Sequence, residues 1–344
     1  MDNIATFQEE HPSLESYWRS VILFGRNVAS YKFALAESLI DLTKAGKSDV
    51  TLDQLAVPYA KHLCEHLKTA PKQATSQSSR FLDACKQFNE GKITEQQLIA
   101  TTVSLGFNNV IDAFHNVNNA ELPVRFYEKD YNASSKRIIL TDDVFKLGEV
   151  AGSSNFMHEA ESRWNLVETA WDLGVSRNLL DVSYDEEKKM FFVNSDFKRR
   201  DVTSARGALN GYQKGKCFYC FADIVVSDDE TNTCDVDHFY PHTLQSIMPD
   251  LNLDGVWNLV LACPDCNRGQ DGKFAKVPHI KYLQRLHKRN EFLISSHHPL
   301  RETIMKQTGQ TEADRVSYLQ DVDKRAINTL IHRWETPAKG EEVF

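Results

Sequence analysis

The chain lacks the features of a membrane or exported protein. Its mean hydropathy is -0.45, and no stretch approaches the roughly 20 apolar residues that a membrane span needs. Residues 1–18, MDNIATFQEEHPSLESYW, are acidic and have neither the basic nor the apolar region of a signal peptide. We therefore expect a soluble cytoplasmic protein that has no membrane partner.

The chain also lacks internal repeats, low-complexity tracts and an excess of basic residues. Its 40 Lys and Arg stand against 48 Asp and Glu, a net charge of -8, whereas nucleic-acid-binding domains are usually basic. The charge is uneven, because residues 198–290 carry a net +2 and the remainder a net -10. Contacts with nucleic acid are thus expected in 198–290, and the acidic remainder suits a protein partner or a homodimer mate.

Cysteine is sparse, and its spacing does not indicate a disulfide framework. Only seven occur in 344 residues, and four of them form two Cys-x-x-Cys pairs, Cys217/Cys220 and Cys263/Cys266. Four thiolates give Zn²⁺ a closed tetrahedral shell, which is a structural site and not a catalytic one. Cys64, Cys85 and Cys234 have no paired partner and are expected to be small buried hydrophobic residues.

Hydrophobic periodicity predicts an α+β protein that is predominantly α-helical. We expect a mostly helical region at 1–195, a zinc-stabilised module at 196–290 and a helical extension at 291–344. Capping boxes Thr51-x-x-Gln54 and Thr94-x-x-Gln97 mark two helix starts. The other predicted helices are 13–46, 80–89, 107–117, 142–149, 159–173, 202–212, 281–294 and 312–335. The predicted strands are 124–129, 136–140, 179–184, 190–193, 222–227 and 234–239.

Residue types suited to hydrolysis lie between the two cysteine pairs. His238 can take a proton from water near neutral pH. Asp237 and Asn267 offer hard oxygen ligands for a divalent ion such as Mg²⁺ or Mn²⁺. Strand alternation would point Asp237 and His238 to opposite faces, so a bulge or strand end must redirect one of them. His242 is a rival base or ligand.

These residues resemble the HNH endonuclease family, also called ββα-metal or His-Me finger nucleases. The resemblance covers residues 216–276 and depends on the four cysteines, on DH-x-x-P at Asp237–Pro241, on Asn258-Leu259, and on the segment from Cys266 to Lys273. It implies a ββα module in which Asp237 and Asn267 bind the catalytic ion and His238 activates the attacking water. Asn258 matches the middle residue of the family name. It could fix the loop that carries His238 through amide hydrogen bonds, or cap the helical turn that follows.

The resemblance implies a metal-dependent endonuclease that hydrolyses DNA phosphodiester bonds, as bacterial restriction or phage-defence nucleases do. Arg268 and Lys273 would contact phosphates nearest the ion, and Lys216, Arg199 and Arg200 would bind nucleic acid further away. Arg285, Lys288 and Arg289 could also follow the phosphate backbone. The alternative is a zinc-stabilised nucleic-acid-binding subunit that is inactive without a partner protein.

Overall fold

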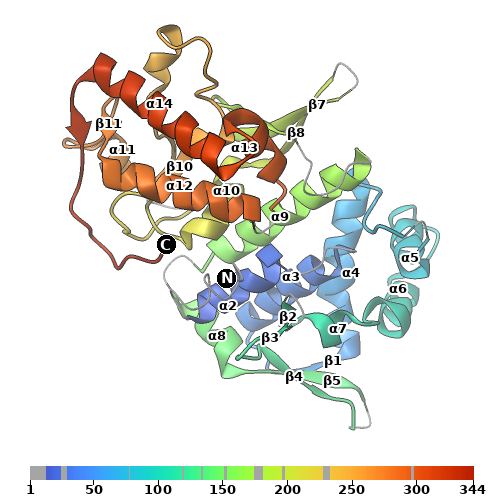
Figure 1. The fold of residues 1–344 in the computed structure, drawn as a ribbon. Coiled ribbons are helices and arrows are strands. Elements are labelled where there is room, and N and C mark those ends of the chain that lie inside the picture. The colour runs from blue at the N-terminus through green and yellow to red at the C-terminus, as the bar shows by residue number, and fades with distance from the viewer. Residues whose placement is uncertain are drawn as a thin grey trace. The chain divides into compact units, whose positions relative to one another are not determined.

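The computed structural model describes the chain except residues 1–12, 25–28, 77, 118–119, 133–134, 151–152, 174–180, 196–197, 228–232 and 296–297 (Figure 1). Its fold is α+β and about 53% helical. The backbone contacts divide it into two compact units, here called the N-terminal unit (Pro12–Gly174) and the C-terminal unit (built on Val175–Phe344). The predicted boundary lies near residue 195. The structure divides the chain between Gly174 and Val175, so the strands between residues 183 and 195 belong to the C-terminal unit.

The N-terminal unit is mostly helical. Its helices are α2 (Leu14–Phe24), α3 (Tyr31–Lys44), α4 (Leu52–Thr69), α5 (Arg80–Asn89), α6 (Glu95–Thr101), α7 (Val110–Ala113), α8 (Asp142–Glu149) and α9 (Asn155–Asp172), with a π-helical turn at Thr102–Gly106. Both predicted capping boxes are present, at the starts of α4 and α6. A helix over 107–117 was the wrong prediction, because α7 is one turn long and Asn116–Val117 is already strand β2.

A small antiparallel sheet completes the N-terminal unit. It has the strand order β1 (Asp49–Thr51), β5 (Arg137–Leu140), β4 (Tyr127–Asp130), and β2 pairs with β3 (Ala120–Glu121). The two strands predicted at 124–129 and 136–140 are therefore found with shifted ends. Trp18, Phe24 and Phe33 are buried in its core, and Tyr31 is half-buried.

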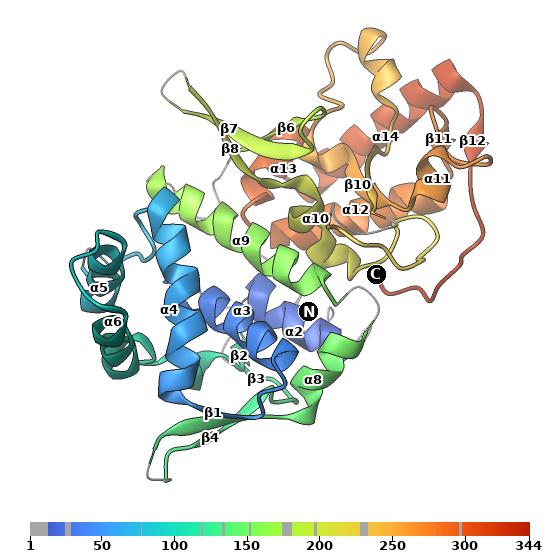
Figure 2. The same cartoon turned by 180° about the vertical axis from the view of Figure 1, so that it is seen from behind.

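The C-terminal unit combines a three-stranded sheet, helices and a small ββα element. The sheet has the order β6 (Ser183–Asp185), β7 (Met190–Ser195), β8 (Lys198–Ser204), and Figure 2 shows it beside α10 (Ala205–Gln213). The helices α12 (Ile280–Ser295), α13 (Arg301–Thr308) and α14 (Glu312–Leu330) follow, and β11 (Val277–Pro278) pairs with β12 (Arg333–Trp334) in parallel. Neither β8 nor α13 was predicted.

The ββα element consists of β9 (Asp235–His238), β10 (Leu259–Ala262) and α11 (Pro264–Arg268). β9 and β10 pair antiparallel, with His238 opposite Leu259. The prediction of residues 222–227 as the second strand is wrong, because in the structure they make only isolated bridges. The strand is instead Leu259–Ala262, a run of four buried residues whose continuous apolar character gives no alternation to detect. No helix of the described residues is both long and apolar enough to cross a membrane.

Candidate hydrolytic and metal-binding site

Two knuckles bring the four paired cysteines together. Cys217 and Cys220 lie in a tight turn in which the amide of Phe221 donates to the carbonyl of Cys217 at 3.0 Å. Cys263 follows β10 and caps α11, and Pro264 begins that helix, where its missing N–H costs nothing. The C-terminal segment covers the first knuckle, since the amide of Lys339 donates to the carbonyl of Cys220 at 2.7 Å.

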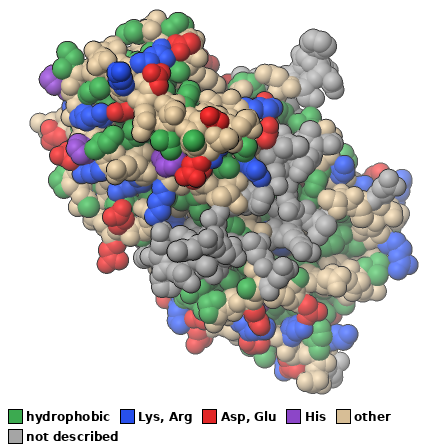
Figure 3. Space-filling model, in the orientation of Figure 1, with side chains coloured by type: hydrophobic (Ala, Val, Ile, Leu, Met, Phe, Trp, Pro, Cys, Tyr) green, Lys and Arg blue, Asp and Glu red, His purple; other side chains and the backbone are tan. Residues whose placement is uncertain are grey.

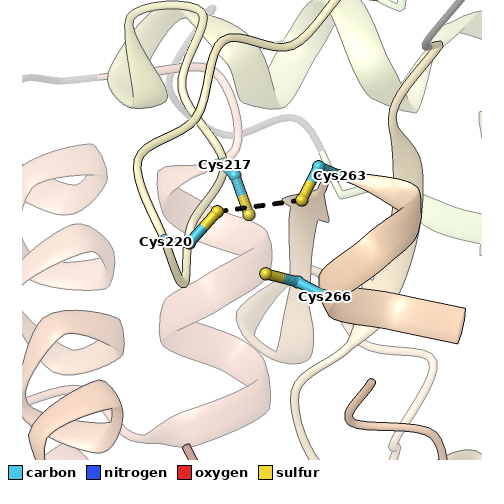
Figure 4. Close-up of side chains that lie close together, drawn as sticks. All are labelled: Cys217, Cys220, Cys263 and Cys266. Atoms are coloured by element: carbon cyan, nitrogen blue, oxygen red, sulfur yellow. Dashed lines mark hydrogen bonds between the residues drawn. The ribbon is translucent and has the colours of Figure 1, made fainter. Parts of the chain in front are cut away.

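The four cysteines form a buried group that could hold a zinc ion. Figure 4 shows the sulfur atoms converging from the two knuckles, and the Sγ atoms of Cys220 and Cys263 are 3.8 Å apart. Tetrahedral Zn–S bonds of about 2.3 Å place the sulfur atoms about 3.8 Å from one another. All seven cysteines are free thiols. The donor set and its spacing therefore fit zinc, as the sequence predicted.

The strand β9 sends Asp237 and His238 in different directions. The pairing of β9 with β10 runs residue for residue from Asp235 to His238, with no bulge among these described residues. Asp235 and Asp237 consequently share one face of the strand, and His238 lies on the other. No bulge redirects either side chain within β9, and His238 is the last residue of that strand.

Asp237 is engaged by two buried neighbours. Its Oδ1 lies 3.1 Å from Nζ of Lys273, and its Oδ2 accepts a hydrogen bond of 2.6 Å from the hydroxyl of Tyr219. Lys273 is 1% exposed and Asp237 is 6% exposed. Burial raises the pKa of Asp237, and the charge of Lys273 acts against that rise. Lys273, expected to contact phosphate, is thus the counter-charge of a buried carboxylate.

Asn267 and Arg268 both bind Asp235. Asn267 donates through Nδ2 to Oδ2 of Asp235 at 3.0 Å, and Arg268 donates through Nε to the same oxygen at 2.8 Å. The side chain of Arg268 remains 65% exposed. The structure therefore places Asn267 beside Asp235, and the side-chain hydrogen bonds of the described residues include Asn267 with Asp235 but not Asn267 with Asp237.

Asn258 fixes the loop that connects β9 and β10. Its Oδ1 accepts from the amide of Tyr240 at 2.8 Å, and its Nδ2 donates to the carbonyls of Tyr240 and Leu253. Asn258 is fully buried. These bonds hold the two ends of the loop, next to His242 and Asp254, and give Asn258 a positioning role.

His238, His242 and Asp254 converge at the end of β9. Nε2 of His238 lies 2.9 Å from Oδ1 of Asp254, and Nδ1 of His242 lies 2.8 Å from the same oxygen. His238 is 9% exposed, whereas the side chains of His242 and Asp254 are 59% and 40% exposed. The hydrogen bond from His238, followed by that from His242, lowers the pKa of Asp254. The site is therefore an ionised carboxylate between two imidazoles, open to solvent on one side.

Asp254 was missed in the sequence, and so were Tyr219 and Asp235. Asp254 lies in irregular backbone before Gly255, where no periodicity exists to single out one acid. The Asp-Gly pair that indicates a turn was the available signal, but it does not predict what the carboxylate contacts.

The remaining predicted basic residues have different surroundings. Lys216 pairs with Asp223 at 2.6 Å. Arg199 and Arg200 belong to β8, opposite Asn194 and Val193, and their side chains lie outside the described structure. Arg289 is buried and donates to the carbonyl of Trp257, and Arg285 donates to the carbonyl of Phe218. Both guanidinium groups therefore bind backbone carbonyls within the C-terminal unit.

Comparisons of the chain with protein-family models, with curated proteins and with solved structures gave no match. The resemblance to HNH nucleases therefore depends on the motif residues alone.

Proposed function

We propose that the chain is a zinc-stabilised, divalent-metal-dependent endonuclease that hydrolyses DNA phosphodiester bonds. The observation that supports the proposal is the cluster of His238, His242 and Asp254 at the end of β9. Oδ1 of Asp254 lies 2.9 Å from Nε2 of His238 and 2.8 Å from Nδ1 of His242. An imidazole held by a carboxylate is a common device for activating water. The four-cysteine group provides a rigid base for the module that carries it.

The proposed reaction is the attack of water on phosphorus, with release of the 3′ oxygen. Water would be activated at the group formed by His238, His242 and Asp254, which is partly open to solvent through the exposed side chains of His242 and Asp254. Asp254 fixes the orientation of the His238 ring, and Asn258 fixes the loop that carries Asp254. A divalent ion would supply charge for the developing phosphorane and for the leaving oxygen.

The substrate contacts are proposed on the C-terminal unit. Arg268 is a predicted phosphate-binding residue of this unit whose side chain is largely exposed, at 65%. On the face drawn in Figure 3, basic and acidic side chains are interspersed and the described residues form no continuous basic surface. We therefore propose that DNA is bound locally around the site, and that the acidic remainder of the chain binds a partner protein or a second copy.

A plasmid cleavage assay tests the proposal. Purified protein should nick or linearise plasmid in the presence of a divalent ion, and His238→Ala should lower the rate by at least about 100-fold, the scale of loss of a residue that activates water. His332→Ala is the matched control, because His332 is an exposed histidine outside the site. Cleavage by His238→Ala at the unaltered rate would refute the assignment.

The alternative function has its own result in the same assay. If the protein retards DNA in a gel but none of the ions tested supports cleavage, the chain is a zinc-stabilised binding subunit. If cleavage appears when a candidate partner protein is added, the site is catalytic in the complex.

A further inference from the structure

Three ligand atoms of the C-terminal unit lie close enough to bind one metal ion. His238, His242 and Asp254 each offer one ligand atom within 4.8 Å of the others, and Nε2 of His238 and Nδ1 of His242 both lie against Oδ1 of Asp254. Ligand bonds of about 2.1 Å place neighbouring donors about 3.0 Å apart in octahedral geometry and about 3.4 Å apart in tetrahedral geometry. The measured 2.8 and 2.9 Å separations from Asp254 fit adjacent positions around one ion.

The loop that supplies two of these ligands is held by bonds unrelated to them. Asn258 ties Tyr240 to Leu253, and Gln245 donates to the carbonyl of Leu251 at 2.6 Å and accepts from the amide of Leu253. The backbone on either side of His242 and Asp254 is therefore fixed without an ion. Ligands held in place in advance bind a metal at a lower entropic cost.

An aromatic residue borders the cluster. The ring of Tyr184 packs edge-on against that of His238, with centroids 6.1 Å apart, and the hydroxyl of Tyr184 is buried. Glu186 acts on this hydroxyl through its charge and through a hydrogen bond. Tyr184 therefore packs against one side of the His238 ring.

We propose that His238, His242 and Asp254 bind the catalytic divalent ion, and that Asp237 and Asn267 do not. Three protein ligands leave coordination positions open for a water and a phosphoryl oxygen, which is the arrangement of catalytic metal sites. The role of this ion in hydrolysis rests on the proposed endonuclease function, whereas its binding does not.

The donor set determines which ion is bound. Two imidazole nitrogens and one carboxylate favour borderline ions such as Co²⁺, Ni²⁺ and Zn²⁺, whereas Mg²⁺ prefers oxygen ligands. Asp237 and Asn267 would have given an all-oxygen set selective for Mg²⁺. The two placements of the ion therefore differ in metal preference as well as in residues.

Direct binding of Co²⁺ tests the proposal without DNA. The full chain is first loaded with one equivalent of zinc, which fills the four-cysteine group, and is then titrated with CoCl₂ while its visible absorption is followed. We expect one further equivalent of Co²⁺ with the weak bands of nitrogen and oxygen ligands. His242→Ala should weaken this binding by about 100-fold or more, since even outer-shell changes cost 10- to 100-fold.

Four variants separate the possible outcomes. Because its side chain is 59% exposed, His242 can be replaced with little risk to folding, and Asp254→Asn should show the same loss of Co²⁺. His332→Ala should bind Co²⁺ as the unaltered chain does. The proposal is overturned if no second equivalent binds, or if Asp237→Asn loses it while His242→Ala keeps it. Full Co²⁺ binding without DNA cleavage would instead overturn the endonuclease function.

Discussion

Replacing Lys273 with methionine should destabilise the C-terminal unit by about 3–5 kcal/mol, because the buried carboxylate of Asp237 loses its counter-charge. The two charged atoms are 3.1 Å apart, and an effective dielectric constant of about 20 gives a gross attraction of about 5 kcal/mol. Nζ of Lys273 also donates to the carbonyls of His238 and Phe274, at 2.9 and 3.1 Å. The loss approaches the whole stability of a small domain.

A double-mutant cycle keeps this prediction testable when the single variant is poorly folded. Asp237→Asn alone leaves the ammonium of Lys273 buried without an opposite charge, and should cost about 3 kcal/mol. The double variant Asp237→Asn/Lys273→Met removes both charges. Its free energy of unfolding should therefore be no lower than that of the less stable single variant. We expect a coupling energy of about 2 kcal/mol or more between the two sites.

Hydrogen exchange of zinc-loaded protein measures these changes at the amides of β9 and β10, which pair Asp237 with Val260. Asp237→Asn separates the two roles of this residue. If Asp237 is structural, its variant loses protection at β9 and retains Co²⁺ binding in whatever fraction is folded. A variant with unchanged protection and no metal binding would refute the reasoning, since Asp237 would then be a ligand.

Two further predictions concern stability. Cys217→Ser, or removal of zinc by a chelator, should unfold the C-terminal unit while exchange protection in α3 and α4 persists; unchanged protection of β9 would show that no metal stabilises it. In the N-terminal unit, burial lowers the pKa of His66, but hydrogen bonds to Glu161 and Glu168 raise it to about 10. The stability from this charge is present below about pH 6.5 and should be lost as the pH rises through 10, with denaturant unfolding of His66→Gln showing no such slope.

The zinc group was predictable because its geometry is local. Each Cys-x-x-Cys pair folds as a knuckle through contacts within a few residues, such as the bond from Phe221 to Cys217. The sequence also predicted that the two pairs meet, since four thiolates complete one tetrahedral shell. No knowledge of the intervening segment was needed, and the wrong assignment of 222–227 as a strand did not affect this prediction.

The ligand set around His238 was not predictable in the same way. Asp254 reaches His238 because Asn258 and Gln245 hold an irregular loop through side-chain bonds to its backbone. Such bonds have no period along the sequence, so hydrophobic pattern and turn signals do not reveal them. The burial of Lys273 was not predictable either. The residue follows Gly272, and nothing in the local sequence indicates that its side chain is only 1% exposed.

The regular alternation of β9 links these two results. Without a bulge, Asp237 must face the interior beside Tyr219 and Lys273 while His238 faces the loop. A metal ion bound by Asp237 would bring a second positive charge next to the buried ammonium of Lys273, which repulsion opposes. An ion on the opposite face meets the ionised Asp254 and two imidazoles. The position of Lys273 therefore favours the proposed ion site at His238, His242 and Asp254 over one at Asp237.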